Sequence, residues 1–359
     1  MKPSTRKSTH KSTRKSTLWS SALLLLAMLL LLSACGGANQ PAAEPTNANA
    51  NANDNANQAA EQPDDSSDEA TEASQDETRQ VAHAMETTEL TGTPERVVVL
   101  TQEGTEALLE LGVTPVGAVN SGLGDGWFPH IAEQMAGVTE LGDESQPNLE
   151  LILSLQPDLI IGNKIRHEEI YAQLKEIAPT VLSEDLAGKW KVNFALYAQA
   201  LNKQAEGETA MAAYDAHVAD AKAALGDKTQ LQVSLVRFLP ETVRIYQKDT
   251  FAGVIMSDLG IARPASQDVD NFMEVIEKER IEALDGDVMF YFNADYDEEK
   301  GGTKNQQAWM ADPLFANLNV GKKNTAFQVD EVIWNLSGGI KSANLLIDQL
   351  VEKLQGIEK

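Results

Sequence analysis

The chain of 359 residues carries 54 acidic and 29 basic residues, which gives a formal net charge of −25 at pH 7. This charge excludes nucleic acid as a partner, because binding phosphates requires a basic face. The single cysteine, Cys35, excludes structural disulfides within the chain, and a protein of this size can build a core without them. Arginines in so acidic a chain indicate local tasks, such as holding an anionic ligand.

Residues 1–34 are predicted to be a lipoprotein export signal. Six basic residues and no acidic residue precede an apolar run at 18–32, which is short for a membrane span and typical of a signal peptide. The run ends in Leu32-Ser33-Ala34-Cys35-Gly36, which resembles the bacterial lipobox and makes Cys35 the expected lipidation site. The alternative is an unlipidated signal with an incidental cysteine. Removal of the signal leaves 23 basic against 54 acidic residues, a net charge of −31.

Residues 35–80 are expected to form a disordered tether. They consist mainly of Ala, Asn, Gln, Pro, Glu, Asp and Ser, with few apolar residues other than Ala. Such a segment buries too little apolar area to offset the entropy lost on ordering. The tether would let an anchored domain reach its partner, or it is a low-complexity spacer whose length has no function.

Residues 81–200 are predicted to form an N-terminal α/β lobe. Apolar, β-branched runs predict strands at 96–100, 115–119, 158–162 and 180–182. Segments with helical periodicity lie between them, at 104–111, 149–155 and 167–177. This alternation is typical of a mainly parallel sheet with helices on both faces.

A long helix and a second α/β lobe are expected to follow. Residues 206–225, within a connecting segment at 201–228, show helical periodicity over about 20 residues, or about 30 Å. In 229–359 the strands are predicted at 231–238, 242–246, 288–292 and 326–329, and the helices at 251–259, 312–318 and 338–355. The predicted fold is therefore α/β, with two Rossmann-like lobes of mainly parallel sheet joined by a single long linking helix.

Several motifs, in order along the chain, resemble the helical-backbone class of periplasmic binding proteins, which serves importers of ferric siderophores, haem and vitamin B12. The similarity runs from about residue 86 to the C-terminus. The class-level motifs are PERVVVL at 94–100, EALLELGV at 106–113, PNLE at 147–150 and LQPDLI at 155–160. Four further motifs narrow the resemblance to the iron-siderophore branch: SLVRF at 234–238, FAG at 251–253, GIARP at 260–264 and VIWN at 332–335.

The resemblance implies a substrate-binding lipoprotein of an ABC importer, with its ligand in a cleft between the lobes. The linking helix would permit only small closure motions, so binding without chemistry is expected. The cargo would be a ferric siderophore that brings its own iron, and no intrinsic cofactor or metal site is expected. The implied partners are a permease dimer with its cytoplasmic ATPase, and the membrane through the lipid anchor. We expect a monomer on the outer face of the cytoplasmic membrane or in a periplasm.

Two glutamates are expected to dock onto the permease, one from each lobe, because the family places an acidic residue on each outer face. By motif the N-terminal one is Glu150. The C-terminal one is assigned to Glu279, although Glu277 and Glu282 lie close enough to take the role. The alternative for all of them is an ordinary solvated acid on a helix.

The cleft of a siderophore-binding protein needs guanidinium groups and aromatic walls, because its ligand is bulky, partly apolar and often anionic. Arg237, beside a strand of the second lobe, and Arg166, after the strand that ends at Gly162, are the first candidates, with Arg244 and Arg263 as further ones. The aromatic candidates are Trp334, Trp190, Trp127 and Tyr291. The alternatives are surface ion pairs for the arginines and core positions for the aromatic residues. The motif around Arg237 favours hydroxamate or citrate-hydroxamate ligands, by resemblance.

Two other functions remain as alternatives. The same fold could bind haem, with Tyr291 or His167 as axial ligand, or a corrinoid; a bare metal ion is disfavoured because the histidines are scattered without ligand spacing. An α/β enzyme such as a hydrolase is the more remote alternative. The sequence has no G-x-S-x-G, no G-x-G-x-x-G after a strand and no G-x-x-x-x-G-K-[ST].

Overall fold

The computed structural model describes residues 77–124 and 126–357. The predicted export signal, Cys35 and most of the 35–80 segment lie outside these residues. Within the described part, no helix is both long and apolar enough to cross a membrane.

The described chain opens with an antiparallel hairpin, β1 (Thr78–Ala82) and β2 (Thr87–Thr91). Strand β1 thus includes the last three residues of the segment 35–80, which the sequence assigned to a tether. The Arg79 side chain fixes the hairpin by donating hydrogen bonds to backbone oxygens of Gly92, Gln199 and Ala200. The last two of these residues are more than a hundred positions away in sequence, so composition alone could not reveal that Arg79 packs on this lobe.

The N-terminal sheet has five parallel strands in the order β5-β4-β3-β8-β9. The strands are β5 (Thr139–Glu140), β4 (Gly117–Ala118), β3 (Val97–Val99), β8 (Leu159–Asn163) and β9 (Thr180–Ser183). Alternate residues of one strand pack in different clusters, Val97 and Val99 on one face and Val98 and Leu100 on the other. Both faces are therefore buried, as a parallel sheet requires.

Most helices of this lobe lie between its strands in the chain, and α5 follows the last strand, β9. The helices are α1 (Gln102–Glu110), α2 (Leu149–Ser154), α3 (Lys164–His167), α4 (Tyr171–Ile177) and α5 (Trp190–Ala200), with 3₁₀ turns η1 (Glu168–Ile170) and η2 (Ala187–Lys189) and a small hairpin of β6 (Gly142–Asp143) and β7 (Gln146–Pro147). The single helix expected at 167–177 is broken, because His167 and Ile170 have non-helical backbone angles.

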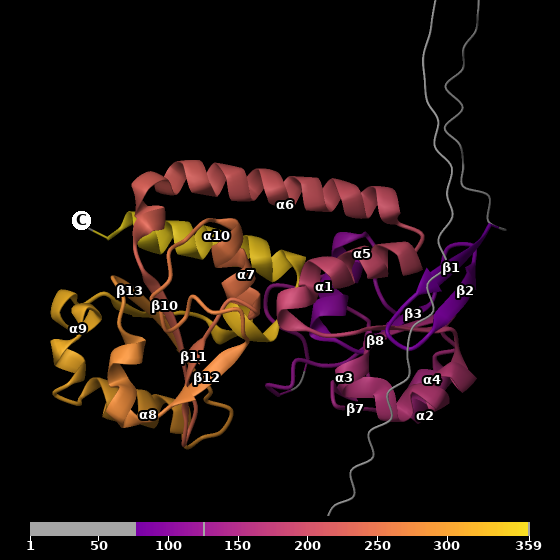
Figure 1. The fold of residues 1–359 in the computed structure, drawn as a ribbon. Coiled ribbons are helices and arrows are strands. Elements are labelled where there is room, and N and C mark those ends of the chain that lie inside the picture. The colour runs from indigo at the N-terminus through magenta and orange to yellow at the C-terminus, as the bar shows by residue number, and fades with distance from the viewer. Residues whose placement is uncertain (1–76, 125, 358–359) are drawn as a thin grey trace, which may run out of the picture. The chain divides into compact units, whose positions relative to one another are not determined.

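Helix α6 (Gln204–Leu225) connects the two sheets and runs alongside α10 (Ile340–Gln355), as Figure 1 shows. Its 22 residues include the predicted helix at 206–225. It ends at Gly226, whose φ of 51° is a conformation that favours glycine.

The C-terminal sheet is mixed, with strand order β12-β11-β10-β13-β14. The strands are β12 (Met273–Ile276), β11 (Val243–Tyr246), β10 (Val233–Phe238), β13 (Val288–Asn293) and β14 (Ala326–Gln328). Strands β10, β13 and β14 are parallel, whereas β11 and β12 are antiparallel to their neighbours. The link from β10 to β11 is too short for a parallel crossover, which needs a dozen or more residues.

The helices of this lobe are α7 (Phe251–Asp258), α8 (Gly301–Met310), α9 (Asn319–Lys323) and α10, with short turns η3 (Gly226–Gln230), η4 (Lys278–Leu284), η5 (Phe315–Asn317) and the π-helical η6 (Val332–Leu336). The helix expected at 312–318 is only the turn η5, and neither α8 nor β12 was expected from the sequence. Helix α8 is rich in Gly, Gln, Asn and Lys, so its apolar period is weak.

One apolar cluster is shared by both lobes. It contains residues of α1, α5, α6, α7 and α10 together with residues of both sheets, while the opposite face of each sheet has a separate cluster. The two sheets are thus joined along one side by a continuous core.

Candidate functional site

A cavity of about 460 Å³ lies between the lobes. The N-terminal lobe lines it with residues 102–103, 144, 165–166 and 185–187, and the C-terminal lobe with residues 237, 244, 246, 272 and 335–338. Residues 102–103, 165–166 and 185–187 follow the carboxyl ends of β3, β8 and β9, and Arg237 lies near the carboxyl end of β10. Ligands of α/β sheets bind at this edge.

Two arginines face each other across the β10–β11 pair. Arg237 and Arg244 are direct partners in the antiparallel register, so their side chains share one face of the sheet. The hairpin SLVRFLPETVRIY contains both, and its turn decides that they meet. Like charges at directly opposed positions are destabilising, so the fold must supply counter-charge or a ligand must bring it.

The Arg237 guanidinium contacts three side chains. Its Nη2 lies 2.6 Å from Oε1 of Glu331 and also donates to the Tyr296 hydroxyl, and its Nη1 donates to the Tyr246 hydroxyl at 3.2 Å. Burial by itself lowers the pKa of Arg237, but Tyr246, Glu331 and Tyr296 outweigh it and hold the pKa above its ordinary value. The guanidinium is therefore a fixed, positively charged part of the cavity wall.

Arg244 and Arg166 are held less closely, although Arg166 lies near Asp143 and Glu144 and acts to lower the pKa of both carboxyls. No ion pair formed among residues 77–124 and 126–357 includes either of them, and the buried Nε of Arg244 has no hydrogen-bond partner there. Arg166 is exposed on α3, opposite the C-terminal lobe. The cavity thus receives guanidinium groups from both lobes, and the two unpaired ones are available to an anion.

The cavity also has apolar and acidic surfaces. Ile165 and Phe272, one from each lobe, are 62% and 43% exposed and give it an apolar rim. Burial raises the pKa of Glu103 to about 8 and that of Glu144 to about 7. Carboxyls with such values are neutral over part of the physiological pH range.

The four aromatic residues proposed from the sequence lie elsewhere. Trp334 is fully buried, packs against Phe290 with ring centroids 5.0 Å apart and donates its indole N–H to Gln349. Trp190 is 1% exposed and packs edge-on against Tyr214 and Phe251.

Trp127 is half-buried against the shared core. Tyr291 belongs to the cluster on the other face of the C-terminal sheet from Arg237. The structure therefore brings Arg237, Arg244 and Arg166 together, without these four rings. Arg263 also lies away from the cavity, where it donates to Val233, Tyr246 and Gln267.

Three residues that the sequence did not single out complete the site. Tyr246 follows Arg244 by two residues in β11, so the period of two along a strand could have identified it. Phe272 and Glu103 come from loop and helix positions whose convergence depends on the tertiary fold.

The two proposed docking glutamates are both exposed. Glu150 is in the first turn of α2 in the N-terminal lobe, and Glu279 is in η4 of the C-terminal lobe. Their exposure leaves both side chains accessible to another protein.

Neither residue proposed as a haem ligand reaches the cavity. His167 is buried. Its Nδ1 accepts from the Asn163 backbone N–H at 3.1 Å, and its Nε2 lies 2.9 Å from the backbone carbonyl oxygen of Glu144. Burial lowers its pKa. In the part of the chain that the structure describes, no cluster of His, Cys, Asp and Glu could hold a metal ion.

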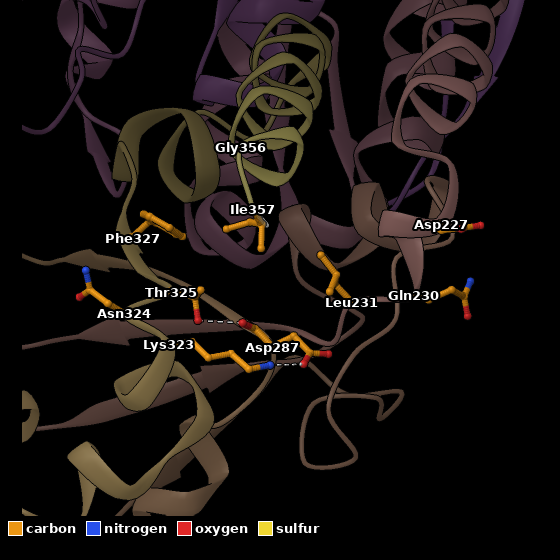
Figure 2. Close-up of a pocket in the computed structure, with 10 residues that line it drawn as sticks. All are labelled: Asp227, Gln230, Leu231, Asp287, Lys323, Asn324, Thr325, Phe327, Gly356 and Ile357. Atoms are coloured by element: carbon orange, nitrogen blue, oxygen red, sulfur yellow. Dashed lines mark hydrogen bonds and ion pairs between the residues drawn. The ribbon is translucent and has the colours of Figure 1, made fainter. Parts of the chain in front are cut away.

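A second cavity, of about 720 Å³, lies at the opposite edge of the C-terminal sheet. Figure 2 shows Asp287 at its centre, with its backbone oxygen accepting from Thr325 and its carboxylate paired with Lys323 at 3.3 Å. Leu231, Asp287 and Thr325 precede β10, β13 and β14, so this cavity is at the amino ends of the strands. We take the interlobe cavity as the site, because its groups are convergent and partly unpaired.

Known proteins resemble this chain over most of its described length. The family model described as periplasmic binding protein matches residues 97–332. The Bacillus subtilis (strain 168) protein named "Probable siderophore-binding lipoprotein YfiY" is 47% identical over 265 residues, which are 72% of this chain and 82% of that protein. The "Fe(3+)-citrate-binding protein YfmC" of the same organism is 30% identical over 258 residues, 71% of this chain and 79% of that protein.

A solved structure of the same class agrees in fold. The structure titled as Staphylococcus aureus SirA complexed with staphyloferrin B has a TM-score of 0.72 and 37% identity, and the match covers 77% of this chain and 99% of that one. The two α/β lobes expected from the sequence are thus confirmed. The family-model match spans most of both lobes, and the chain belongs to the periplasmic binding protein family.

Proposed function

We propose that this chain is an extracytoplasmic binding protein that captures an anionic ferric siderophore between its lobes and delivers it to an ABC importer. The observation that carries the proposal is the convergence of Arg166, Arg237 and Arg244 on one cavity, with the last two directly opposed across a strand pair. An anion bound there is attracted by guanidinium groups whose mutual repulsion it relieves.

The ligand class follows from the chemistry of the wall. Guanidinium groups match the paired oxygens of carboxylates and other chelating groups, and the exposed side chains of Ile165 and Phe272 offer apolar contact to the rest of a bulky chelate. We favour a hydroxamate or citrate-hydroxamate type. The names of the relatives support an iron chelate: one is a probable siderophore-binding lipoprotein, another binds Fe(3+)-citrate, and SirA was solved with staphyloferrin B.

The remaining parts of the proposal concern delivery. Cys35 would carry the lipid that holds the protein at the outer face of the cytoplasmic membrane or in a periplasm; each methylene buried in lipid contributes about 0.8 kcal/mol. Glu150 and Glu279 would contact basic residues of the permease dimer, and the ATPase of the importer would drive release. The protein would act by binding alone, without catalysis.

A haem or corrinoid ligand is the second candidate, and it has less support. Both ring nitrogens of His167 have partners in the fold, and Tyr291 is on the far face of its sheet. Three arginines suit an anionic chelate better than a corrinoid.

The test is a tryptophan-fluorescence titration of the purified full chain in detergent with ferric hydroxamate, citrate-type and catecholate siderophores, and with haem and cobalamin. We expect saturable quenching by one siderophore class. Affinity should fall at least tenfold in Arg237→Ala, since charge-assisted hydrogen bonds contribute about 1.5–3 kcal/mol each.

The control variant is Arg280→Ala, because Arg280 is an exposed arginine that pairs with Glu274 outside the cavity. It should bind like the unaltered chain. Binding of haem or cobalamin alone, or equal losses in both variants, would contradict the proposal.

A further inference from the structure

The interlobe cavity contains a buried carboxyl with one oxygen unused. Glu103, in the first turn of α1, is 5% exposed and lines the cavity. Its Oε1 accepts from Nδ2 of Asn193 at 2.7 Å and lies 3.5 Å from the Tyr197 hydroxyl. Its Oε2 is buried and has no hydrogen-bond partner within the described residues. A buried polar atom without a partner is costly, so a partner from outside the chain is the natural explanation.

The groups around Glu103 leave a negative charge on it poorly stabilised. The hydrogen bonds from Asn193 and Tyr197 of α5 favour the charged form, but burial and the nearby acids, Glu144 in the β6–β7 turn and Glu106 one turn along α1, outweigh them. No ion pair among residues 77–124 and 126–357 includes Glu103. Burial is the largest cause of its raised pKa, about 8. At pH 7 the side chain is mainly a neutral acid.

A neutral acid has a donor that a carboxylate lacks. Once protonated, a carboxyl can donate one hydrogen bond through its O–H. With Oε1 occupied as an acceptor by Asn193, the proton belongs on Oε2, which is the oxygen without a partner. An anionic oxygen is the acceptor that would bind it best.

The charge of the cavity depends on the same proton. Its wall carries three arginines and three acids, Glu103, Glu144 and Asp185. Arg237 is also paired with Glu331, which lies outside the lining. With both glutamic acids neutral, the three guanidinium groups therefore face two carboxylates, Asp185 and Glu331, and with both ionised they face four. The net charge of these groups is positive only when Glu103 and Glu144 are protonated.

We propose that Glu103 binds the ferric siderophore as a neutral acid, donating its Oε2 proton to an anionic oxygen of the ligand, so that capture is linked to proton occupancy. This inference rests on the proposed function and adds a specificity residue to it. The donor belongs to α1 of the N-terminal lobe and two of the arginines to β10 and β11 of the C-terminal lobe, so the ligand would be held from both lobes. Alkaline conditions would weaken capture, because ionised Glu103 repels the ligand it otherwise binds.

The test compares the full chain with Glu103→Gln and Glu103→Ala in calorimetric titrations with Fe(3+)-staphyloferrin B and Fe(3+)-citrate from pH 6 to 9. Gln is a permanent neutral donor of the same shape, so its affinity should stay within about threefold of the unaltered chain at pH 7. The unaltered chain should lose affinity by about tenfold per pH unit above pH 8, as expected for one linked proton. That alkaline loss should be absent in Glu103→Gln, and Glu103→Ala should bind at least tenfold more weakly at pH 7.

Three controls separate the outcomes. Glu144→Gln tests whether the other cavity acid is responsible, Glu150→Gln is a neutralisation outside the cavity, and thermal melts check that each variant folds. If Glu103→Gln keeps the full alkaline loss, or if it binds more tightly at pH 7 because a negative charge has been removed, the inference is overturned while the proposed function stands.

If the unaltered chain binds neither chelate, the link between capture by these two ligands and Glu103 is overturned, whereas the hydroxamate class of the proposed function is decided by its own fluorescence titration. The infrared band of a protonated carboxylic acid then reports Glu103 independently of any ligand. Its presence at pH 7 in the unaltered chain and its loss in Glu103→Gln would keep the neutral acid, and its absence from the unaltered chain would overturn that as well.

Discussion

The Glu106 carboxylate joins the two lobes by accepting hydrogen bonds from Ser342 at the start of α10. Its Oε2 lies 2.8 Å from the Ser342 backbone nitrogen and 3.1 Å from the Ser342 hydroxyl, and its Oε1 lies 2.6 Å from Nε2 of His130. Glu106 is 1% exposed. An N-terminal-lobe acid therefore caps a C-terminal-lobe helix, which adds a polar anchor to the shared apolar core.

Replacing Glu106 by Ala should destabilise the protein by about 2–3 kcal/mol, because buried donors of Ser342 and His130 lose a charged acceptor. Urea denaturation measures the change. The matched control is Glu110→Ala, one turn further along α1, whose carboxylate lies 3.1 Å from Lys341 of the same helix α10 but near the surface. An exposed pair of that kind contributes about 0–1 kcal/mol. Equal losses in the two variants would contradict an anchoring role for Glu106.

Replacing Arg244 by Met should stabilise the unliganded protein slightly and weaken ligand binding. The change removes a like charge directly opposite Arg237 and a buried Nε without a partner. The free energy of unfolding should therefore rise by about 0.2–1 kcal/mol. The affinity for the ferric siderophore should fall about tenfold or more, since one guanidinium contact is lost. Thermal melting and titration of the same samples measure both effects.

Arg280→Met is the control for this pair of measurements, because Arg280 is exposed and pairs with Glu274. It should leave stability and affinity nearly unchanged. A destabilised Arg244→Met with unaltered affinity would mean that Arg244 serves the fold and not the ligand.

Stability should decline as pH rises from about 5 to 9, in part through Glu103 and Glu144. Burial raises the pKa of Glu103 to about 8 and that of Glu144 to about 7, whereas an unfolded glutamate titrates near 4.3. The folded state therefore holds more protons than the unfolded state in this window, so the contribution is complete below the unfolded pKa and is lost as pH rises through the folded values. Glu103→Gln should equal the unaltered chain near pH 5 and exceed it near pH 9, by a few kcal/mol at most.

The measurement is the difference in unfolding free energy between Glu103→Gln and the unaltered chain at the two pH values. Taking a difference cancels the general repulsion within an acidic protein. Glu150→Gln, at an exposed position, should show no such dependence on pH. A constant difference between Glu103→Gln and the unaltered chain would mean that Glu103 ionises normally in the fold.

Trp190→Ala should unfold the protein much more readily, at a cost of about 3–5 kcal/mol, because a buried ring is replaced by a cavity. Trp190 packs against Tyr214 of α6 and Phe251 of α7, so the substitution removes packing contacts between the N-terminal lobe, the linking helix and the C-terminal lobe. Trp127→Ala, at a half-buried position, should cost less. A Trp190→Ala variant that kept its stability and lost only ligand affinity would restore the cleft role predicted from the sequence.

The alternation of apolar segments was enough to predict most of the fold. Strands around Val98, Ile160 and Leu235 follow from short apolar runs, and the long helix at 206–225 follows from an uninterrupted Ala-rich and charged segment. Both signals depend on only a few neighbouring residues. The edges of the domain were less predictable. Strand β1 begins inside a segment that looks like a tether, and polar helix α8 lacks a clear apolar period.

The candidate site could also be predicted only in part from the sequence. Arg237 and Arg244 could be proposed from one hairpin, since a short turn between strands places their side chains on a common face. Trp190 and Trp334 could not be assigned, because a large aromatic residue beside a loop can pack in a core or line a cleft with the same local sequence. Two of the four aromatic predictions, Trp190 and Trp334, therefore named residues that the fold buries, and none of the four lines the cavity, whereas Tyr246 and Phe272 do.

The sequence by itself determined the order of strands and helices, the acidic charge and the arginine hairpin, because these properties belong to residues that are close along the chain. Only the tertiary structure decided that Glu103 meets an arginine cavity and that Glu106 caps a helix more than two hundred residues away. Such contacts depend on which strand ends converge and which side chains lose their water. Both are consequences of packing two lobes on one core, and no local pattern records them.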